Sequence, residues 1–290
     1  TFGSDKNRVL RMSKAQIKGL VDNQIIPTIK HYPGDGVDER DQHLLSSVNC
    51  LSADDWSNSY GHIYQELIDD GVPAVMIAHI YQPAWERKLN PAIKDEELRP
   101  ASASKLLIDG LLRTELGFNG LTITDATAMV GYNVILPRKE LLPATINAGI
   151  DMILFNKNID EDYAIVTEAV KSGVISAERL DEAVTRILAT KLAQNLMDEQ
   201  GQFIDNIPTE LDLNSEKHHQ IAAEIAQKSV TLVKDRDQLL PISPEKTPRI
   251  RLVVLGDSDD GGFKEGGKVT DLFKLGLEKA GFEVTPFQMD

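Results

Sequence analysis

The sequence predicts an α/β fold with a parallel sheet, for two reasons. From about residue 11, amphipathic helical stretches alternate with short apolar runs, as in successive βα units. Polar residues also follow these apolar runs at their C-terminal ends. Both a βα barrel and a doubly wound sheet bind ligands at the carboxyl ends of their strands. The pattern alone therefore leaves both architectures open, and it places a candidate site at those ends.

Four apolar runs are the expected strands. They are residues 24–30, 72–80, 121–124 and 150–155. Lys30 and His31 finish the first run, His79 the second, Asp125 the third and Asn156 the fourth. Because the loops that follow parallel strands surround one pocket, we expect these side chains to converge.

Helical stretches separate the expected strands. Residues 102–116 precede the third run and end at Gly117, and residues 138–148 precede the fourth and end at Gly149. Glycine is favoured directly after a helix because it adopts a positive φ without strain. Residues 177–196 carry apolar side chains at three- and four-residue spacing, which predicts a packing helix without a chemical role.

The polar segment 198–214, which contains Gly201 and Pro208, is typical of a linker. We therefore expect a first domain over residues 1–200, a linker over 201–214 and the beginning of a second domain over 215–290.

The second domain is expected to form a βαβ unit. Its predicted elements are a helix at 218–230, a strand at 250–255, a glycine-rich loop at 256–267, a helix at 270–280 and a strand at 282–285. The loop has neither G-x-G-x-x-G nor Walker spacing, and it carries several aspartates that would repel phosphate. Nucleotide binding is not expected there.

Composition argues against several classes of protein. The net charge of -14 and the pI near 4.9 disfavour a nucleic-acid binder. Cys50 is the single cysteine, and no Cys/His cluster has zinc spacing, so neither a metal nor another cofactor is expected. No apolar run reaches the roughly 18 residues of a membrane helix. Neither end reads as a natural terminus, so the bacterial cytoplasm and the cell envelope or exterior both stay open as locations.

The densest charged stretch is residues 30–43, KHYPGDGVDERDQH. A solvated surface loop is one interpretation, since loops carry both charge and function. Two details favour a functional loop. Pro33 and the glycines beside it fix a tight path, and Asp41 lies two residues before His43, within reach of its imidazole. A carboxylate that is hydrogen-bonded to one ring nitrogen fixes the tautomer and raises the proton affinity of the other nitrogen. That second nitrogen is then suited to general acid/base chemistry.

A second candidate is Asp125, in the stretch 120–129, GLTITDATAM. An acid directly after an apolar strand can serve as a nucleophile or a metal ligand. Considered by itself, Asp125 more often caps the next helix, which Asp does frequently. A metal role is less favoured, because no other acids or histidine pairs cluster with it.

These residues resemble the signature of family 3 glycoside hydrolases, in the β-N-acetylglucosaminidase branch that recycles bacterial cell-wall fragments. That signature reads Lys-His-Phe/Ile-Pro-Gly-His/Leu-Gly, four residues, then Asp-Ser/Thr-His. The stretch from Lys30 to His43 has the same spacing, with Asp35 and Gln42 departing from the pattern. The turn around Asp125 is similar to the family's nucleophile turn. Both departures lie in the loop expected to close over the sugar, which leaves the substrate open.

The resemblance implies the second half of a TIM-type (β/α)8 barrel followed by the start of an α/β sandwich domain. It implies that Asp125 attacks the anomeric carbon and that His43, held by Asp41, is the acid/base. Lys30 and His31 would hold sugar hydroxyls. His79 either lines the pocket or is a hydrogen-bonded structural histidine.

The function implied is a retaining β-N-acetylglucosaminidase, an O-glycoside hydrolase that cleaves terminal β-linked N-acetylglucosamine through a covalent glycosyl-aspartate. Its partner would be a carbohydrate, including cell-wall fragments. Three alternatives stay open: a phosphorylase of the same branch, a family 3 β-glucosidase or β-xylosidase, and a non-catalytic carbohydrate-binding homologue. Because the piece lacks half of the expected barrel, we expect the isolated chain to show little activity.

Overall fold

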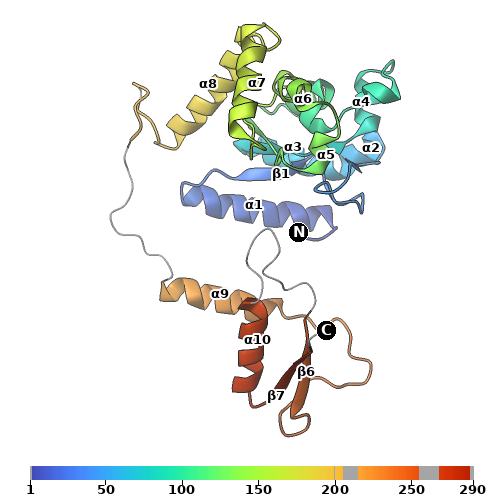
Figure 1. Cartoon of the computed structure of the whole chain (residues 1–290), viewed down its shortest axis with the longest axis vertical. Helices are drawn as coiled ribbons and strands as arrows, with labels where there is room; N and C mark the ends of the chain where they lie inside the picture. The colour runs from blue at the N-terminus through green and yellow to red at the C-terminus, as the bar shows by residue number, and fades with distance from the viewer. Residues whose placement is uncertain (1, 199, 205–214, 255–267, 288–290) are drawn as a thin grey trace. The chain divides into compact units, whose positions relative to one another are not determined.

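The computed structural model divides into two compact units, residues 1–207 and 208–290 (Figure 1). It describes residues 2–198, 200–204, 215–254 and 268–287. The expected linker at 201–214 falls mostly outside these ranges, so the predicted domain limits stay a prediction.

The first unit is built on a parallel sheet whose strands lie in chain order. The strands β1 (Thr28–Tyr32), β3 (Ala74–Ile77) and β5 (Leu121–Thr124) are hydrogen-bonded in the order β1-β3-β5. A parallel bridge between Ile123 and Met152 continues this order into the fourth apolar run. The predicted parallel α/β sheet is therefore confirmed.

Two strands differ from the prediction: one begins later than expected, and the other is divided in two. The first begins at Thr28 rather than residue 24, because Gln24 has a φ of 58° and Ile25 donates its N–H back to the preceding helix, which excludes an extended strand there. Lys30 and His31 consequently lie inside β1. The second run divides into β3 and the short β4 (Ile80–Tyr81), which pairs with β2 (Ser47–Val48).

The helices of the first unit cover the sheet and connect its strands (Figure 1). Several begin at a side-chain cap: the Asp5 carboxylate accepts the Arg8 N–H, and Ser176 caps the last long helix in the same way. Their bounds are α1 Lys6–Asp22, α2 Ala53–Trp56, η1 Ser57–Gly61, α3 His62–Asp69, α4 Pro83–Leu89, η2 Asp95–Glu97, η3 Ala101–Ala103, η4 Leu106–Glu115, α5 Val130–Asn133, α6 Arg138–Asn147, α7 Ile159–Lys171 and α8 Ala177–Ala193.

The helix expected at 102–116 is a short 3₁₀ turn, η3, followed by a π-helix, η4. The hydrophobic core lies between η4, α3 and the sheet. Tyr32, Trp56 and Leu111 are fully buried there. Tyr32 packs edge-on against Trp56, with ring centroids 6.3 Å apart, and its hydroxyl donates to the Leu107 carbonyl at 2.8 Å. This packing ties β1 to η4 and so fixes the strand ends.

A buried ion cluster lies near the beginning of β5. The Asp151 side chain has no solvent exposure, and it accepts hydrogen bonds from Arg113 at 3.0 Å, Arg179 at 2.7 Å and Arg186 at 3.3 Å. The Thr122 backbone N–H and hydroxyl donate to the same carboxylate. Five donors therefore surround one buried charge, as a buried carboxylate requires.

The second unit contains a βαβ arrangement, as predicted. Its elements are α9 Glu216–Ser229, β6 Arg249–Val253, α10 Lys268–Lys279 and β7 Glu283–Phe287. The two strands are parallel, with Ile250 opposite Val284. The glycine-rich loop at 256–267 lies outside the described residues. Across the described ranges, no helix combines the length and apolar character that a membrane crossing needs.

Candidate active site

Asp125 follows β5 directly and lies at the carboxyl edge of the sheet. Its backbone N–H donates to the Ile77 carbonyl of β3 at 2.8 Å, and its Oδ1 accepts the Ala126 N–H at 2.8 Å. The side chain is 15% exposed, so the carboxylate is partly accessible. The next helix, α5, begins at Val130 and has Met129 as its N-cap. Asp125 therefore caps no helix here, and the capping interpretation is wrong.

His31 lies between two carboxylates. Its Nε2 is 3.8 Å from Asp125 Oδ2, and its Nδ1 is 3.9 Å from Asp35 Oδ2. Both separations are too long for hydrogen bonds, so the contacts are electrostatic. Burial lowers the pKa of His31, and the Lys30 charge adds to this, whereas Asp125 and Asp35 oppose it. The structure thus brings His31 and Asp125 together, as the sequence predicted.

Lys30 precedes His31 on β1 and is exposed. Within the described part of the chain, its ammonium group makes no hydrogen bond or ion pair. Its three donors are consequently available to a bound molecule.

Asp41 and His43 form the expected dyad. Asp41 Oδ1 accepts hydrogen bonds from His43 Nδ1 at 2.7 Å and from the His43 backbone N–H at 2.9 Å, and these bonds lower the pKa of the Asp41 carboxyl. Because the carboxylate only accepts, the proton of a neutral His43 ring lies on Nδ1. Its Nε2 is then free to exchange a proton with a ligand. The side chains are 69% exposed for His43 and 59% for Asp41.

The turn between β1 and the dyad is fixed by packing. Gly34 has a φ of +128°, and a Cβ at that position would lie 2.3 Å from the Tyr60 ring. The Tyr60 hydroxyl donates to the Asp35 carbonyl at 2.8 Å. Only glycine fits this approach, which accounts for the Pro-Gly turn in the sequence.

His79 lies behind the Asp125 turn rather than on the open surface. It is fully buried, and burial lowers its pKa to about 4, so the ring is neutral near pH 7. Its Nε2–H donates to the Ala126 carbonyl at 3.1 Å, and its Nδ1 accepts from the Ser102 hydroxyl at 2.9 Å. Both ring nitrogens are bonded to protein, as expected for a hydrogen-bonded structural histidine.

A second network that sequence reasoning missed supports the Asp125 turn from the other side. Arg138 makes two hydrogen bonds of 2.5 Å to Asp162, and it also donates to the Thr127 carbonyl and hydroxyl. Asn156 donates to Asp162 at 3.0 Å, so it joins this network instead of the group around Asp125. These residues share no short motif, and no sequence signal joins them.

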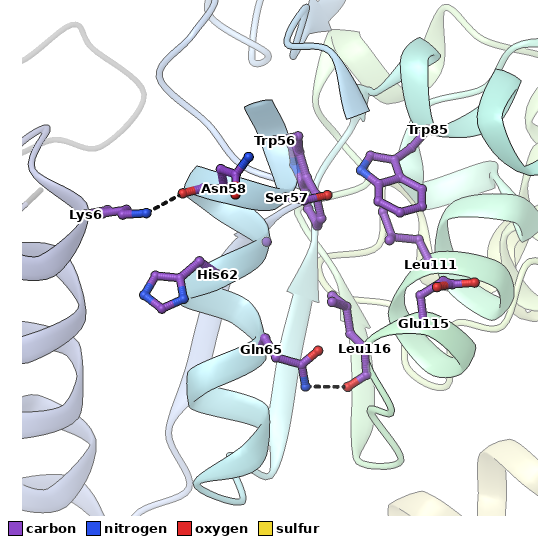
Figure 2. Close-up of a pocket in the computed structure, with 11 residues that line it drawn as sticks. Lys6, Trp56, Ser57, Asn58, His62, Gln65, Trp85, Leu111, Glu115 and Leu116 are labelled. Atoms are coloured by element: carbon purple, nitrogen blue, oxygen red, sulfur yellow. Dashed lines mark hydrogen bonds between the residues drawn. The ribbon is translucent and has the colours of Figure 1, made fainter. Parts of the chain in front are cut away.

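A hollow of about 340 Å³ lies elsewhere in the unit, between α1, η1, α3 and η4 (Figure 2). Trp56 and Trp85 line it, and Lys6 closes one side by donating to the Asn58 carbonyl at 2.7 Å. None of the predicted site residues lines this hollow. Across the ranges that the structure describes, no three His, Cys, Asp or Glu side chains form a group suited to a metal ion.

Chemically, the strand ends offer a partly buried carboxylate, an imidazole beside it, and an exposed imidazole whose tautomer a second carboxylate fixes. A carboxylate of this kind can act as a nucleophile, and the oriented imidazole can supply and remove a proton.

Comparison with known proteins places these features in context. The family model described as the glycosyl hydrolase family 3 N terminal domain matches residues 1–190. A β-N-acetylglucosaminidase/β-glucosidase of Cellulomonas fimi is 42% identical over 290 residues, which are 99% of this chain and 51% of that protein.

Two solved structures are also similar to this chain. A β-glucoside phosphorylase, BglX, is 48% identical, with a TM-score of 0.88 over 99% of this chain and 51% of that one. A β-N-acetylglucosaminidase of Paenibacillus sp. str. FPU-7 is 26% identical, with a TM-score of 0.77 over 97% of this chain and 51% of that one. The chain spans about half the length of these relatives.

Proposed function

This chain belongs to glycosyl hydrolase family 3, and on that premise we propose that its full-length protein is a retaining β-N-acetylglucosaminidase. The membership also confirms the predicted fold, because the first unit is part of the family's TIM-type barrel domain. The proposed substrates carry terminal β-linked N-acetylglucosamine, including cell-wall fragments.

The observation that carries the proposal is the bond between His43 Nδ1 and Asp41, in the same strand-end region as Asp125. Asp125 attacks the anomeric carbon while the bond to the leaving oxygen breaks, and His43, which carries a proton on both ring nitrogens at this step, gives its Nε2 proton to that oxygen. A water then attacks the glycosyl-aspartate, its proton passes to His43, and the Asp125 carboxylate is released. The sugar keeps its configuration because two displacements occur.

The other site residues have supporting roles in this proposal. Lys30 is exposed and unpaired among the described residues, and with His31 it holds sugar hydroxyls. His79 acts indirectly, since its ring donates to the Ala126 carbonyl beside the nucleophile.

A second candidate is phosphorolysis, with phosphate in place of water. It is favoured by the similarity to a β-glucoside phosphorylase structure and by the imidazole of His43, which would serve as the base. A deprotonated imidazole is neutral, so it does not repel an incoming phosphate as a carboxylate would.

Nitrophenol release from aryl β-N-acetylglucosaminide by the full-length protein tests the proposal. Asp125→Ala should abolish release. Azide should partly restore the activity of His43→Ala, because it attacks the glycosyl-aspartate directly and, unlike water, needs no base to remove a proton. Undiminished release by Asp125→Ala would rule out the mechanism. Faster cleavage of the β-glucoside or β-xyloside would instead assign the glucosidase or xylosidase alternative.

Running the same assay with and without inorganic phosphate separates the two candidates. Free N-acetylglucosamine under both conditions supports the hydrolase. A sugar 1-phosphate formed only with phosphate supports the phosphorylase.

A further inference from the structure

We propose that Gln42 is a positioning residue for the acid/base dyad, because its buried side chain ties the loop of Asp41 and His43 to the strand ends beside Asp125. The inference rests on the proposed function and deepens it.

Gln42 differs sharply in exposure from the residues beside it. It is only 5% exposed, whereas the side chains of Asp41 and His43 are 59% and 69% exposed. A polar side chain this buried must have hydrogen-bond partners. Its Oε1 accepts the His79 backbone N–H at 3.1 Å. The side chain thus points into the protein, while the two dyad side chains are left accessible to a ligand.

Backbone bonds hold the same loop to the segment after β5. The Gln42 carbonyl accepts the Gly131 N–H at 3.1 Å, and the His43 carbonyl accepts the Val130 N–H at 3.1 Å. A Cβ on Gly131 would lie 2.7 Å from the Gln42 oxygen, so glycine permits this approach. The loop after β1 is therefore bonded to the loops after both β3 and β5.

His79 links Gln42 to the residue beside the proposed nucleophile. Its backbone N–H donates to the Gln42 side chain, and its ring Nε2–H donates to the carbonyl of Ala126, the neighbour of Asp125. The His79 ring also packs on Tyr132 of α5, with ring centroids 4.8 Å apart. A displacement of Gln42 would therefore change where His43 stands relative to Asp125.

The length of the glutamine matters. Two methylenes and the amide carbon separate its acceptor oxygen from Cα. One methylene separates a serine hydroxyl from Cα, so serine would be too short for the same bond. The serine or threonine of the resembled signature would leave the His79 N–H without this partner. Losing a buried partner costs free energy, and here it would also loosen the loop.

The test compares leaving groups in the full-length protein, using 2,4-dinitrophenyl and methyl β-N-acetylglucosaminides. Dinitrophenolate departs without a proton, whereas methoxide needs one from His43. A positioning role predicts that Gln42→Met and Gln42→Ser lower kcat/KM for the methyl glycoside by about 10- to 100-fold. The value of kcat/KM reports only the steps up to the glycosyl-aspartate, so for the dinitrophenyl substrate it should fall far less. Gln42→Glu keeps an acceptor of the same reach and should recover part of the loss.

Glu39→Gln is the matched control, because Glu39 is exposed in the same loop and has no side-chain hydrogen bond or ion pair among the described residues. It should leave the cleavage of both substrates unchanged. Equal losses on both substrates in Gln42→Met, or no loss, would overturn the inference and leave Gln42 a structural residue only.

Hydrogen exchange separates this inference from the proposed function. Gln42→Met should speed exchange at the Val130 and Gly131 amides, since both bond to the dyad loop. Unchanged exchange would contradict the anchor whatever the enzyme's substrate. If the unaltered protein cleaves no glycoside, the proposed function fails, and the exchange result still decides whether Gln42 holds the loop.

Discussion

The two ends of strand β5 carry charged groups in opposite arrangements. Near its beginning, the Asp151 carboxylate is fully buried and accepts from three arginines and from Thr122. Just past its end, the Asp125 carboxylate is partly exposed, and the nearest cation-forming group, His31, is 3.8 Å away. One strand thus connects a saturated charge with an available one.

The difference shows that the partners of a carboxylate decide whether it stabilises the fold or is available for catalysis. A buried carboxylate surrounded by donors has no capacity left for a ligand. Removing it takes away the main counter-charge of the arginines. A carboxylate with few partners contributes less to folding, and its remaining lone pairs can react. In a barrel, residues at the strand beginnings serve stability and those at the carboxyl ends serve catalysis. Four predictions test whether this contrast holds.

Asp125→Asn should have the largest effect on activity and little on stability. We expect kcat of the full-length protein to fall by about 10⁴-fold or more, because the nucleophile is lost. The free energy of unfolding should change by less than about 1 kcal/mol, since few bonds are removed. Aryl glycoside cleavage and urea unfolding measure the two quantities. A large loss of stability with modest loss of activity would break the comparison.

Asp151→Asn should show the reverse. Removing the carboxylate of a buried ion cluster leaves Arg113 without a counter-charge, and Arg179 and Arg186 keep only the exposed Glu182. The free energy of unfolding should therefore fall by about 3–5 kcal/mol. The kcat of the folded enzyme should be unchanged. Urea unfolding can be followed by the fluorescence of Trp56 and Trp85, which both lie in the core of this unit. Unchanged stability would show that the cluster is not needed for folding.

Acid should weaken the fold through His79. Because burial lowers its pKa to about 4 from the usual 6.5, the unfolded state binds a proton between these values that the folded state does not. The His79 contribution is therefore complete above pH 6.5 and is lost as the pH falls to about 4, up to about 3 kcal/mol. We expect the free energy of unfolding to fall less steeply between pH 7 and pH 4 in His79→Asn than in the unaltered protein. An identical slope in the variant would refute the prediction.

Asp22→Asn should have the smallest effect on the free energy of unfolding. It tests whether burial decides how much an ion pair stabilises the fold. Its carboxylate bonds Lys18 at 2.7 Å, but the side chains are 55% and 74% exposed. Water and salt screen such a pair, so we expect a change below about 0.5 kcal/mol in the free energy of unfolding. A cost comparable with that of Asp151→Asn would show that ion-pair number, not burial, decides stability here.

Sequence patterns located the strands whose signals are local. The run at 121–124 matches β5 because β-branched residues lie between the turn before it and Asp125. The first strand was misplaced by four residues at its beginning, because the left-handed backbone at Gln24 leaves no mark in the apolar pattern. The Asp41 and His43 contact was predictable, since two residues of separation suffice for it.

The sequence by itself determined the parallel α/β fold, the family and the set of chemically suited residues, because these depend on periodicity and short motifs. Only the tertiary structure decided which charges are satisfied. The partners of Asp151 come from residues 113, 122, 179 and 186, and Gln42 meets His79 and Gly131 across three loops. Such contacts depend on how the segments pack, and no local pattern encodes them. Asp125 was therefore a helix cap or a nucleophile in sequence, and the packing around it excluded the cap.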